Sequence, residues 1–284
     1  MTLNSIGDQA RAYALQVASN RIKTTLSTLT QEVASGQVAD VGQRVGGNTR
    51  ALNEIEGRIQ LAGQLRQNGQ DAGIRLQAVQ DMFDAVRLST TELGLALATD
   101  PFNDQALLGT RSTEVANAFD SVIQRLNGTN SNRYLLSGEA SDVAPLSDAT
   151  SILDSLQAIV APLTTAADVA QAVSDWFDAP AGGGGFLDTA YHGTLGQPQR
   201  ITVGEGVSVE MQTTGASGPV RDLLKGLATA AILDRGILSG NVAERRELLS
   251  TGGTLMVAAD SAVLGEMGRV GLAQQTVERA QVTG

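Results

Sequence analysis

The chain has 284 residues, of which 42% are hydrophobic but only 3% aromatic, so Ala, Leu, Val and Ile must fill its core, as in helix bundles. A net charge of −10 argues against nucleic acid and an anionic membrane surface as partners. The lack of cysteine excludes disulfides, thiolate metal sites and cysteine nucleophiles.

The first predicted helix covers residues 8–34. Leu15, Ile22 and Leu29 recur every seven residues on one of its faces, and Gly36 suits the left-handed position just after a helix. The Gly-, Asp- and Gln-containing stretch 36–48 is predicted to be a loop. The residues before the helix do not form a secretory signal, and no apolar run approaches transmembrane length, so we expect no membrane insertion.

A second, longer helix is predicted over residues 55–97, where two apolar seams repeat every seven residues without an intervening proline. Such a seam must be buried against another helix. A turn around Pro101 and a capping Asp104 precede a helix that is predicted to end at Asn127 and Gly128. The pattern therefore predicts a long antiparallel helical hairpin.

The composition changes between residues 136 and 218, where Gly, Ala, Ser, Thr, Asp and Pro dominate. Short helices are predicted at 151–160 and 166–177, with the glycine run 182–185 as a flexible connector. Two alternating segments, 200–203 and 207–211, flank a Gly-Glu-Gly turn and predict a β-hairpin. Together these features predict a small mixed α/β insertion.

Helical patterning returns at Pro219, a favourable first residue of a helix. After Gly240 a last helix carries a seam of Leu249, Met256, Val263, Val270 and Val277. This seam has no stop signal, so we expect the native chain to continue beyond Gly284. The predicted fold is mainly α: a long antiparallel helical rod, like a coiled-coil bundle, with a small mixed α/β insertion domain.

No group of residues predicts a catalytic, cofactor or metal site. His192 is the only histidine and has no cysteine to share a metal with. The glycine run lacks the following Gly-Lys-Ser/Thr of a phosphate-binding loop, and no carboxylate pair stands out as an acid/base couple. Asn127-Gly128-Thr129 matches a glycosylation acceptor, but a helix-ending turn is the simpler explanation. We therefore predict that the protein is not an enzyme and needs no cofactor.

One segment carries a resemblance to a known family. Residues 127–146 read NGTNSNRYLLSGEASDVAPL and are similar to the segment after the helical hairpin of flagellar hook-associated protein 3, a flagellin-like family. Leu136 and Leu146 stand where that family often has Phe. The loop at 41–44 lacks the family's Asp-Asp-Pro/Ala triplet, and the N-terminus lacks its usual opening.

This resemblance implies a structural subunit of the bacterial flagellum at the junction of hook and filament. It implies type III export without a cleaved signal peptide, an extracellular location, an export chaperone, contacts with the hook-side junction protein and flagellin, and self-association in a helical array. The implied domains are an inner-tube segment (1–40), the hairpin of the rod (41–138), a variable insertion (139–218) and the returning rod helix (219–284).

Two sets of site residues follow from the seams and the motif. The expected subunit-contact positions are Leu15, Ile22, Leu29, Met256, Val263 and Val270, although a place in the chain's own core is at least as good an interpretation for the last three. Arg133, Tyr134 and Gly138 are expected to brace the base of the insertion.

Two other functions remain open from the sequence. The chain could be a filament flagellin, although the segment expected of ordinary flagellin is absent. It could also be a coiled-coil adaptor unrelated to flagella, in which case the motif is a coincidence.

Overall fold

A computed structural model of the chain describes residues 4–44, 50–99 and 105–283. These residues fall into two units, 1–61 and 62–284. The turn predicted around Pro101, its cap Asp104 and the last part of the predicted loop 36–48 lie outside the described residues.

The first unit contains helix α1 (Asn4–Ser35), the short helix α2 (Val41–Arg44) and the beginning of α3 (Arg50–Thr99). Helix α1 ends as predicted: Gly36 has φ +68° and its N–H donates to the Glu32 carbonyl over 2.8 Å. No side chain within 7–42 or 50–61 is buried. The apolar stripe of α1 therefore has no partner among the described residues of its own unit.

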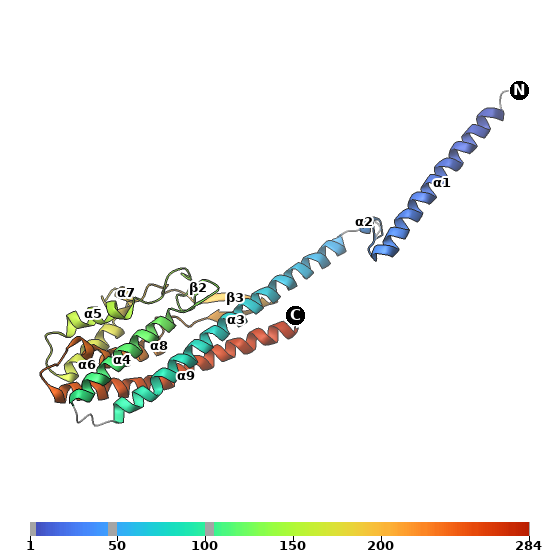
Figure 1. Cartoon of the computed structure of the whole chain (residues 1–284). Coiled ribbons are helices and arrows are strands. Elements are labelled where there is room, and N and C mark those ends of the chain that lie inside the picture. The colour runs from blue at the N-terminus through green and yellow to red at the C-terminus, as the bar shows by residue number, and fades with distance from the viewer. Residues whose placement is uncertain (1–3, 45–49, 100–104, 284) are drawn as a thin grey trace. The chain divides into compact units, whose positions relative to one another are not determined.

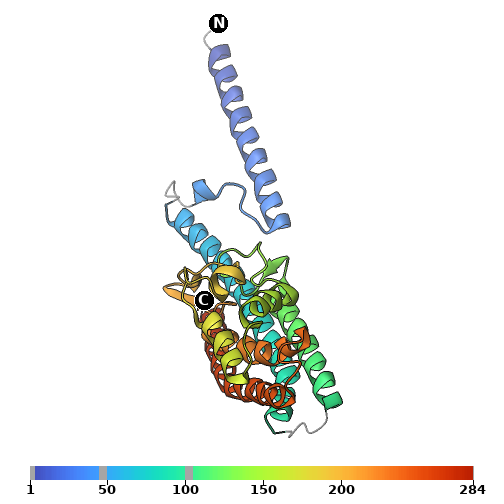
Figure 2. The same ribbon diagram turned by 90° about the vertical axis from the view of Figure 1, so that its left-hand side faces the viewer.

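Helices α3 and α4 (Gln105–Leu126) confirm the two predicted long helices. Burial along α3 begins at Gly69 and continues through Leu76, Phe83 and Leu97, whereas Ile55 and Arg58 at the start of the same seams are exposed. Helix α4 buries Leu108, Val115, Phe119, Val122 and Leu126 completely. Figures 1 and 2 show α4 running back alongside the second half of α3, which agrees with the predicted hairpin.

The insertion contains the predicted elements and some that were not predicted. Helices α5 (Ala149–Val160) and α6 (Ala166–Asp178) and the antiparallel strands β3 (Gln199–Gly204) and β4 (Val207–Met211) are confirmed. A two-residue hairpin of β1 (Thr129–Asn130) and β2 (Arg133–Tyr134) and the short helix α7 (Phe186–Thr189) were missed. Ser131 and Asn132 form the β1–β2 turn with φ of 49° and 60°, the backbone conformation that a type I′ hairpin needs.

The glycine run corrects the prediction of a flexible connector. The Asp188 carboxylate accepts the N–H groups of Gly182 and Gly184 over 2.8 and 2.7 Å, and these bonds hold the pKa of Asp188 below its usual value. A Cβ on Gly185 would lie 2.3 Å from the Trp176 carbonyl oxygen. Glycine is therefore required here because the backbone packs closely against Trp176 and donates hydrogen bonds to Asp188. A flexible connector would make neither contact.

Helix α8 (Gly218–Ala231) has the predicted Pro219 in its first turn but is not simply amphipathic. Every residue from Leu223 to Ala231 is buried, because α4, α6 and α9 (Val242–Thr283) all pack around it. A 3₁₀ turn, η1 (Ile232–Arg235), follows. The buried Lys225 ammonium is held by Asp178 of α6 at 2.6 Å and by Asp222 at 3.4 Å. Helix α8 is thus the central helix of residues 62–284.

Helix α9 is more apolar than predicted. Among the described residues, it is the one helix long and apolar enough to cross a membrane by length and composition, so the prediction that no apolar run approaches that length is wrong. The buried residues of α9, which include Leu249, Val263 and Val277, pack in the core with α8. A place in the core accounts for this composition.

A partly buried ion pair joins α3 to α9. Arg87 donates from Nε and Nη2 to both carboxylate oxygens of Asp260, over 2.8 and 3.2 Å, and Thr91 donates to Oδ1 over 3.1 Å. These bonds, the Arg87 bond first, lower the pKa of Asp260. They also fix the register in which the two helices pass each other.

We expect Asp260→Asn to lower the free energy of unfolding by roughly 1 kcal/mol at pH 7. Because the folded-state pKa of Asp260 is lowered, its contribution is present above the unfolded pKa of about 3.9 and is lost as the pH falls through the folded value. Urea unfolding should therefore show a smaller difference in unfolding free energy between wild type and variant at pH 3 than at pH 7. Glu92→Gln, at an exposed position of α3, is the control; an equal gap at both pH values would contradict the assignment.

Candidate assembly site and structural brace

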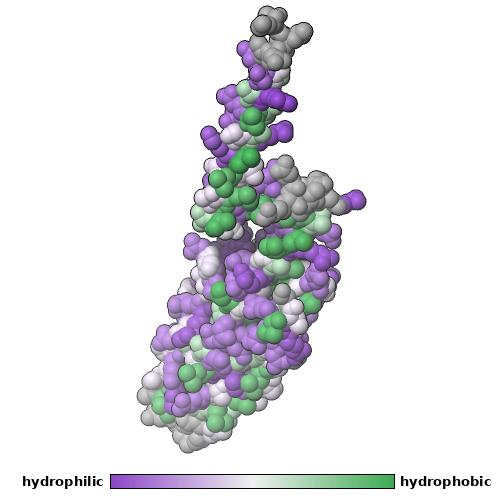
Figure 3. All heavy atoms as spheres, turned by 90° about the vertical axis from the view of Figure 1, so that its right-hand side faces the viewer, coloured by the Kyte–Doolittle hydropathy of each residue, from purple (hydrophilic) through white to green (hydrophobic). Residues whose placement is uncertain are grey.

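The three predicted contact positions on α1 form an exposed apolar stripe. Leu15, Ile22 and Leu29 are 71%, 68% and 46% exposed, and Leu26 and Val33 continue the same line. Figure 3 shows hydrophobic side chains along this helix between hydrophilic ones. Exposed apolar side chains in a row on one helix are typical of a surface that another helix covers. Their role as subunit contacts stays a prediction.

The three predicted contact positions on α9 lie in the core of the chain itself. Met256, Val263 and Val270 are 2%, 1% and 4% exposed, and the backbone N–H and side chain of Met256 lie against Gly226 of α8. The physical reason is that this seam faces α8 and α3 within the same molecule. These residues cannot meet a neighbouring subunit, which corrects their assignment in favour of the alternative interpretation.

The predicted brace residues lie at the start of a strap, residues 127–147, that passes between the rod helices and the insertion. The Tyr134 N–H donates to the Ser141 carbonyl over 2.8 Å, and the Leu135 N–H donates to the Gly128 carbonyl over 3.1 Å. Gly138 has φ +66°, and a Cβ there would lie 2.5 Å from Thr194 Oγ1. Arg133 is exposed, so its guanidinium is not part of this packing.

Backbone hydrogen bonds tie the strap to two distant segments of the insertion. The Thr194 N–H donates to the Ser137 carbonyl over 3.0 Å, and the Gly215 N–H donates to the Leu136 carbonyl over 2.9 Å. Thr194 Oγ1 also accepts the Glu139 N–H over 2.8 Å. The strap thus fixes the loop that leads into β3 and the loop that leads from β4 to α8, which is what a brace at the base of the insertion requires.

Asn127 is a second anchor of the strap. Its Nδ2 donates to the Leu146 carbonyl and its Oδ1 accepts the Leu146 N–H, both over 2.9 Å. The side-chain amide therefore imitates a β-bridge and closes the two ends of the strap. This use of the amide supports the turn interpretation of Asn127-Gly128-Thr129 rather than a glycosylation acceptor.

We expect Asn127→Asp to lower the free energy of unfolding by about 1–3 kcal/mol, because the aspartate cannot donate and leaves the Leu146 carbonyl without its partner. Urea unfolding at pH 7 measures the loss. Asn132→Asp, in the exposed β1–β2 turn, makes the same chemical change as a control. Equal stabilities of the two variants would show that the Asn127 amide does not hold the strap.

Arg75 is a bracing residue that sequence reasoning missed. Its Nη1 donates to Gln199 Oε1 at the start of β3 over 2.7 Å, and its Nη2 approaches the Leu135 carbonyl at 3.4 Å. Burial lowers the pKa of Arg75, and the positive charge of Arg133 lowers it further. Its heptad position on α3 gave no sign of this role, because the two partners lie 60 and 124 residues further along the chain.

His192 also takes part in the packing of the strap. The backbone N–H of His192 donates to the Pro145 carbonyl over 2.9 Å, and the ring nitrogen Nε2 lies 2.8 Å from Ser147 Oγ. Among the described residues no carboxylate is hydrogen-bonded to this ring, and no group of three metal-ligating side chains occurs. The contacts therefore define a loop histidine bonded to a neighbouring serine.

Within residues 62–284, long packed helices thus carry a small α/β insertion on a hydrogen-bonded strap. No protein-family model matches the sequence, and no curated protein matches it. Among solved structures, FlgL from Bacillus cereus is similar with a TM-score of 0.53 at 13% sequence identity, over 83% of this chain and 95% of that chain. A putative flagellar hook-associated protein from Vibrio parahaemolyticus gives a TM-score of 0.42 at 14% identity, over 83% of this chain and 93% of that chain. The chain therefore has the fold of FlgL.

Proposed function

We propose that the chain is a structural subunit of the bacterial flagellum that forms the junction between hook and filament. The observation that carries this proposal is the likeness of fold to FlgL, which extends over 95% of that chain. The motif at Arg133–Gly138, which resembles hook-associated protein 3, lies in the strap that braces the insertion. The similarity of fold and the similarity of motif thus support the same proposed function.

The proposed mechanism is assembly and not catalysis. The apolar stripe of α1, with Leu15, Ile22 and Leu29, becomes buried between neighbouring subunits in a heterologous, non-closing contact. Burial of a leucine-sized side chain contributes about 1.5–3 kcal/mol, so a few such positions suffice to favour assembly. Type III export, escort by a chaperone, an extracellular location and contacts with the hook-side protein and flagellin belong to the same proposal.

Deletion of the gene in the source bacterium tests the proposal. We expect cells that keep their hooks, lose attached filaments and release flagellin into the medium, because the junction is missing. Loss of motility that the wild-type gene restores is the measurement. A deletion strain with normal filaments would contradict the proposal and favour an adaptor unrelated to flagella.

The role of the α1 stripe is tested by complementation. The double variant Leu15→Asp, Ile22→Asp should be made and exported but should not restore filaments, because a charged side chain cannot be buried in an apolar contact without a large cost. Asn20→Asp adds a charge on the other side of the same helix and should restore motility. Equal behaviour of the two would exclude the stripe from the interface.

A filament flagellin is the second candidate, because the same rod architecture would serve it. The purified chain would then polymerise alone into long filaments. Short rings or oligomers without filament growth favour the junction.

A further inference from the structure

Four exposed aliphatic side chains surround one hydrogen bond between α3 and α9. Thr91 Oγ1 of α3 donates to Asp260 Oδ1 of α9 over 3.1 Å. Each of these two residues has an aliphatic residue three positions before it and another four positions after it: Leu88 and Leu95 in α3, Val257 and Leu264 in α9. Residues at these spacings are neighbours on one face of a helix. The four side chains therefore form a single surface, the α3–α9 patch.

The α3–α9 patch has the geometry of a seat for another helix. Its two members on each helix are seven residues apart, which is the spacing of a coiled-coil seam. Helices α3 and α9 run antiparallel (Figure 1), so Leu88 lies level with Leu264 and Leu95 level with Val257. Leu88 is 84% exposed and the other three are 44–56% exposed. Exposed aliphatic side chains gathered on one face are typical of a contact surface.

Carboxylates without a counter-ion border the α3–α9 patch. Asp84 and Glu92 lie four residues before and four residues after Leu88 and are exposed. Among the described residues neither carboxylate forms an ion pair, whereas Asp260 is paired with Arg87. The patch therefore fits an amphipathic helix that carries positive charge beside its apolar stripe.

Helix α1 has both of these properties. Leu15, Ile22 and Leu29 repeat at the same seven-residue spacing and are exposed. Arg21 and Lys23 stand on either side of Ile22; both are exposed, and neither forms an ion pair within the described part of the chain. Helix α1 thus matches the patch in the spacing of its apolar residues and in the sign of its charge.

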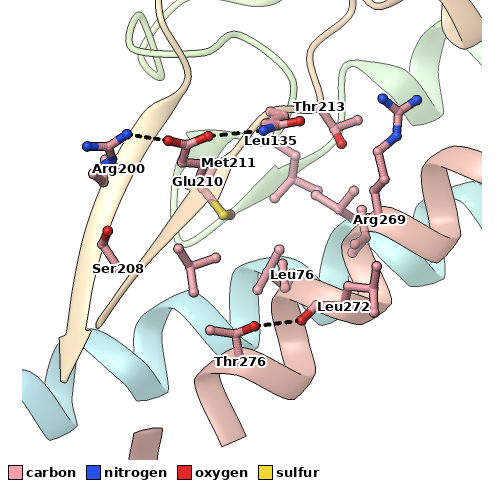
Figure 4. A pocket seen from close by; sticks show the side chains of 15 residues that line it. Leu76, Leu135, Arg200, Ser208, Glu210, Met211, Thr213, Arg269, Leu272 and Thr276 are labelled. Carbon is pink, nitrogen blue, oxygen red and sulfur yellow. Dashed lines mark hydrogen bonds and ion pairs between the residues drawn. The ribbon is translucent and has the colours of Figure 1, made fainter. Parts of the chain in front are cut away.

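The charge is distributed unevenly along the chain. Residues 62–284 hold 25 acidic and 14 basic side chains, whereas α1 holds two acidic and three basic ones. Two copies of residues 62–284 therefore repel each other, but α1 of one copy is attracted to residues 62–284 of another. The groove beside β4 (Figure 4) offers no such attraction, because its arginines are paired, Arg200 with Glu210 and Arg269 with Glu266.

We propose that α1 of a second copy of the chain packs onto the α3–α9 patch, with Ile22 against Leu88. An amphipathic helix that docks in this way takes its affinity from apolar anchors at heptad spacing. Arg21 and Lys23 then lie close to the carboxylates that border the patch. Because α1 and the patch are different surfaces, the contact is heterologous and can continue from copy to copy. The inference rests on the proposed function and deepens it, since it names the surface that receives the α1 stripe.

Removal of apolar side chains from the patch tests the proposal in the full-length protein. The double variant Leu88→Gln, Leu264→Gln changes one exposed residue on each helix. We expect it to weaken self-association at least tenfold in sedimentation velocity over a range of concentrations. The control Ile74→Gln, Leu272→Gln changes two residues of the same helices that are 57% and 65% exposed and lie outside the patch. It should leave self-association unchanged; Leu272 lies at the groove beside β4 (Figure 4).

Disulfide trapping locates the contact, because the chain has no cysteine of its own. The single variants Ile22→Cys and Leu88→Cys are mixed and oxidised with copper phenanthroline. We expect a dimer linked between the two positions, identified by mass spectrometry of the joined peptides. A mixture of Ile22→Cys with Leu272→Cys is the matched control and should give at most a tenth as much linked dimer.

Three results would each overturn the inference: equal association of the two double variants, no dimer linked between positions 22 and 88, or a wild type that stays monomeric at every concentration. The proposed function is judged separately by the deletion phenotype. If Leu88→Gln, Leu264→Gln restored motility while Leu15→Asp, Ile22→Asp did not, the stripe would keep its role and only the receiving surface would be wrong.

Discussion

Gly253→Ala is expected to lower the free energy of unfolding by about 2–3 kcal/mol, although alanine is the better helix former. A Cβ at this position would lie 2.5 Å from the Ala98 backbone nitrogen, 2.6 Å from Leu97 Cβ and 2.8 Å from the Gly94 carbonyl oxygen. All three atoms belong to or adjoin the backbone of α3 and cannot swing aside. Helices α3 and α9 would therefore have to separate along a buried interface.

The neighbouring glycine makes a similar contact with another helix. A Cβ on Gly252 would lie 2.7 Å from Ala230 Cβ and 2.9 Å from the Gly226 carbonyl oxygen, both in α8. Gly252 and Gly253 thus let α9 pack closely against both α8 and α3 at the same point along its length. A change at either position disturbs the packing of three helices.

Two other glycines of α9 provide matched controls. Gly265 and Gly268 are exposed, and a Cβ at either would meet nothing within 4 Å. Gly265→Ala should therefore raise the free energy of unfolding by about 0.5–1 kcal/mol through helix propensity alone. Urea unfolding followed by circular dichroism measures both variants. A stable Gly253→Ala protein would mean that the helices are less closely packed than the structure shows.

The glycine contacts illustrate what the sequence could and could not predict. Seven-residue spacing located the long helices, because one apolar stripe per helix is a local property that the chain order displays. Gly69 offers no apolar side chain to such a stripe, yet it is buried in α3. Close approach of two backbones depends on which helix is the neighbour, and spacing within one helix does not contain that information.

The same distinction applies to the predicted site residues. Exposure of Leu15 and burial of Val263 arise from identical seven-residue patterns, so the pattern alone could not separate a free stripe from a core. The strap was recognised through its motif, but its anchors were not. Asn127 and Arg75 act through partners far along the chain, and a polar side chain gives no local sign of such a bond.

Phe177→Ala should cost about 3–5 kcal/mol of unfolding free energy, the usual loss for a buried phenylalanine. Although the chain is poor in aromatic residues, three of them meet in the insertion. The Phe177 ring stacks on Phe186 with centroids 5.2 Å apart and meets the Trp176 ring edge-on at 5.0 Å. Both phenylalanines are fully buried.

This loss should spread beyond the insertion. The Phe177 carbonyl accepts a bond from Arg221 of α8 over 3.0 Å, and the next residue, Asp178, holds the buried Lys225. Because α8 is the central helix of residues 62–284, we expect the insertion and the rod to unfold as one cooperative unit. Trp176, the single tryptophan, reports on the insertion, and far-ultraviolet circular dichroism reports mainly on the long helices.

The two signals should therefore shift to lower urea together in Phe177→Ala and remain coincident. Leu195→Ala, at an exposed position of the insertion, should change the free energy of unfolding by less than about 0.5 kcal/mol. A fluorescence transition that moves while the dichroism transition stays would show instead that residues 139–218 fold as a separate domain. In that case the aromatic cluster would stabilise the insertion alone, and the close packing of α3, α8 and α9 at their glycines would hold the rod without it.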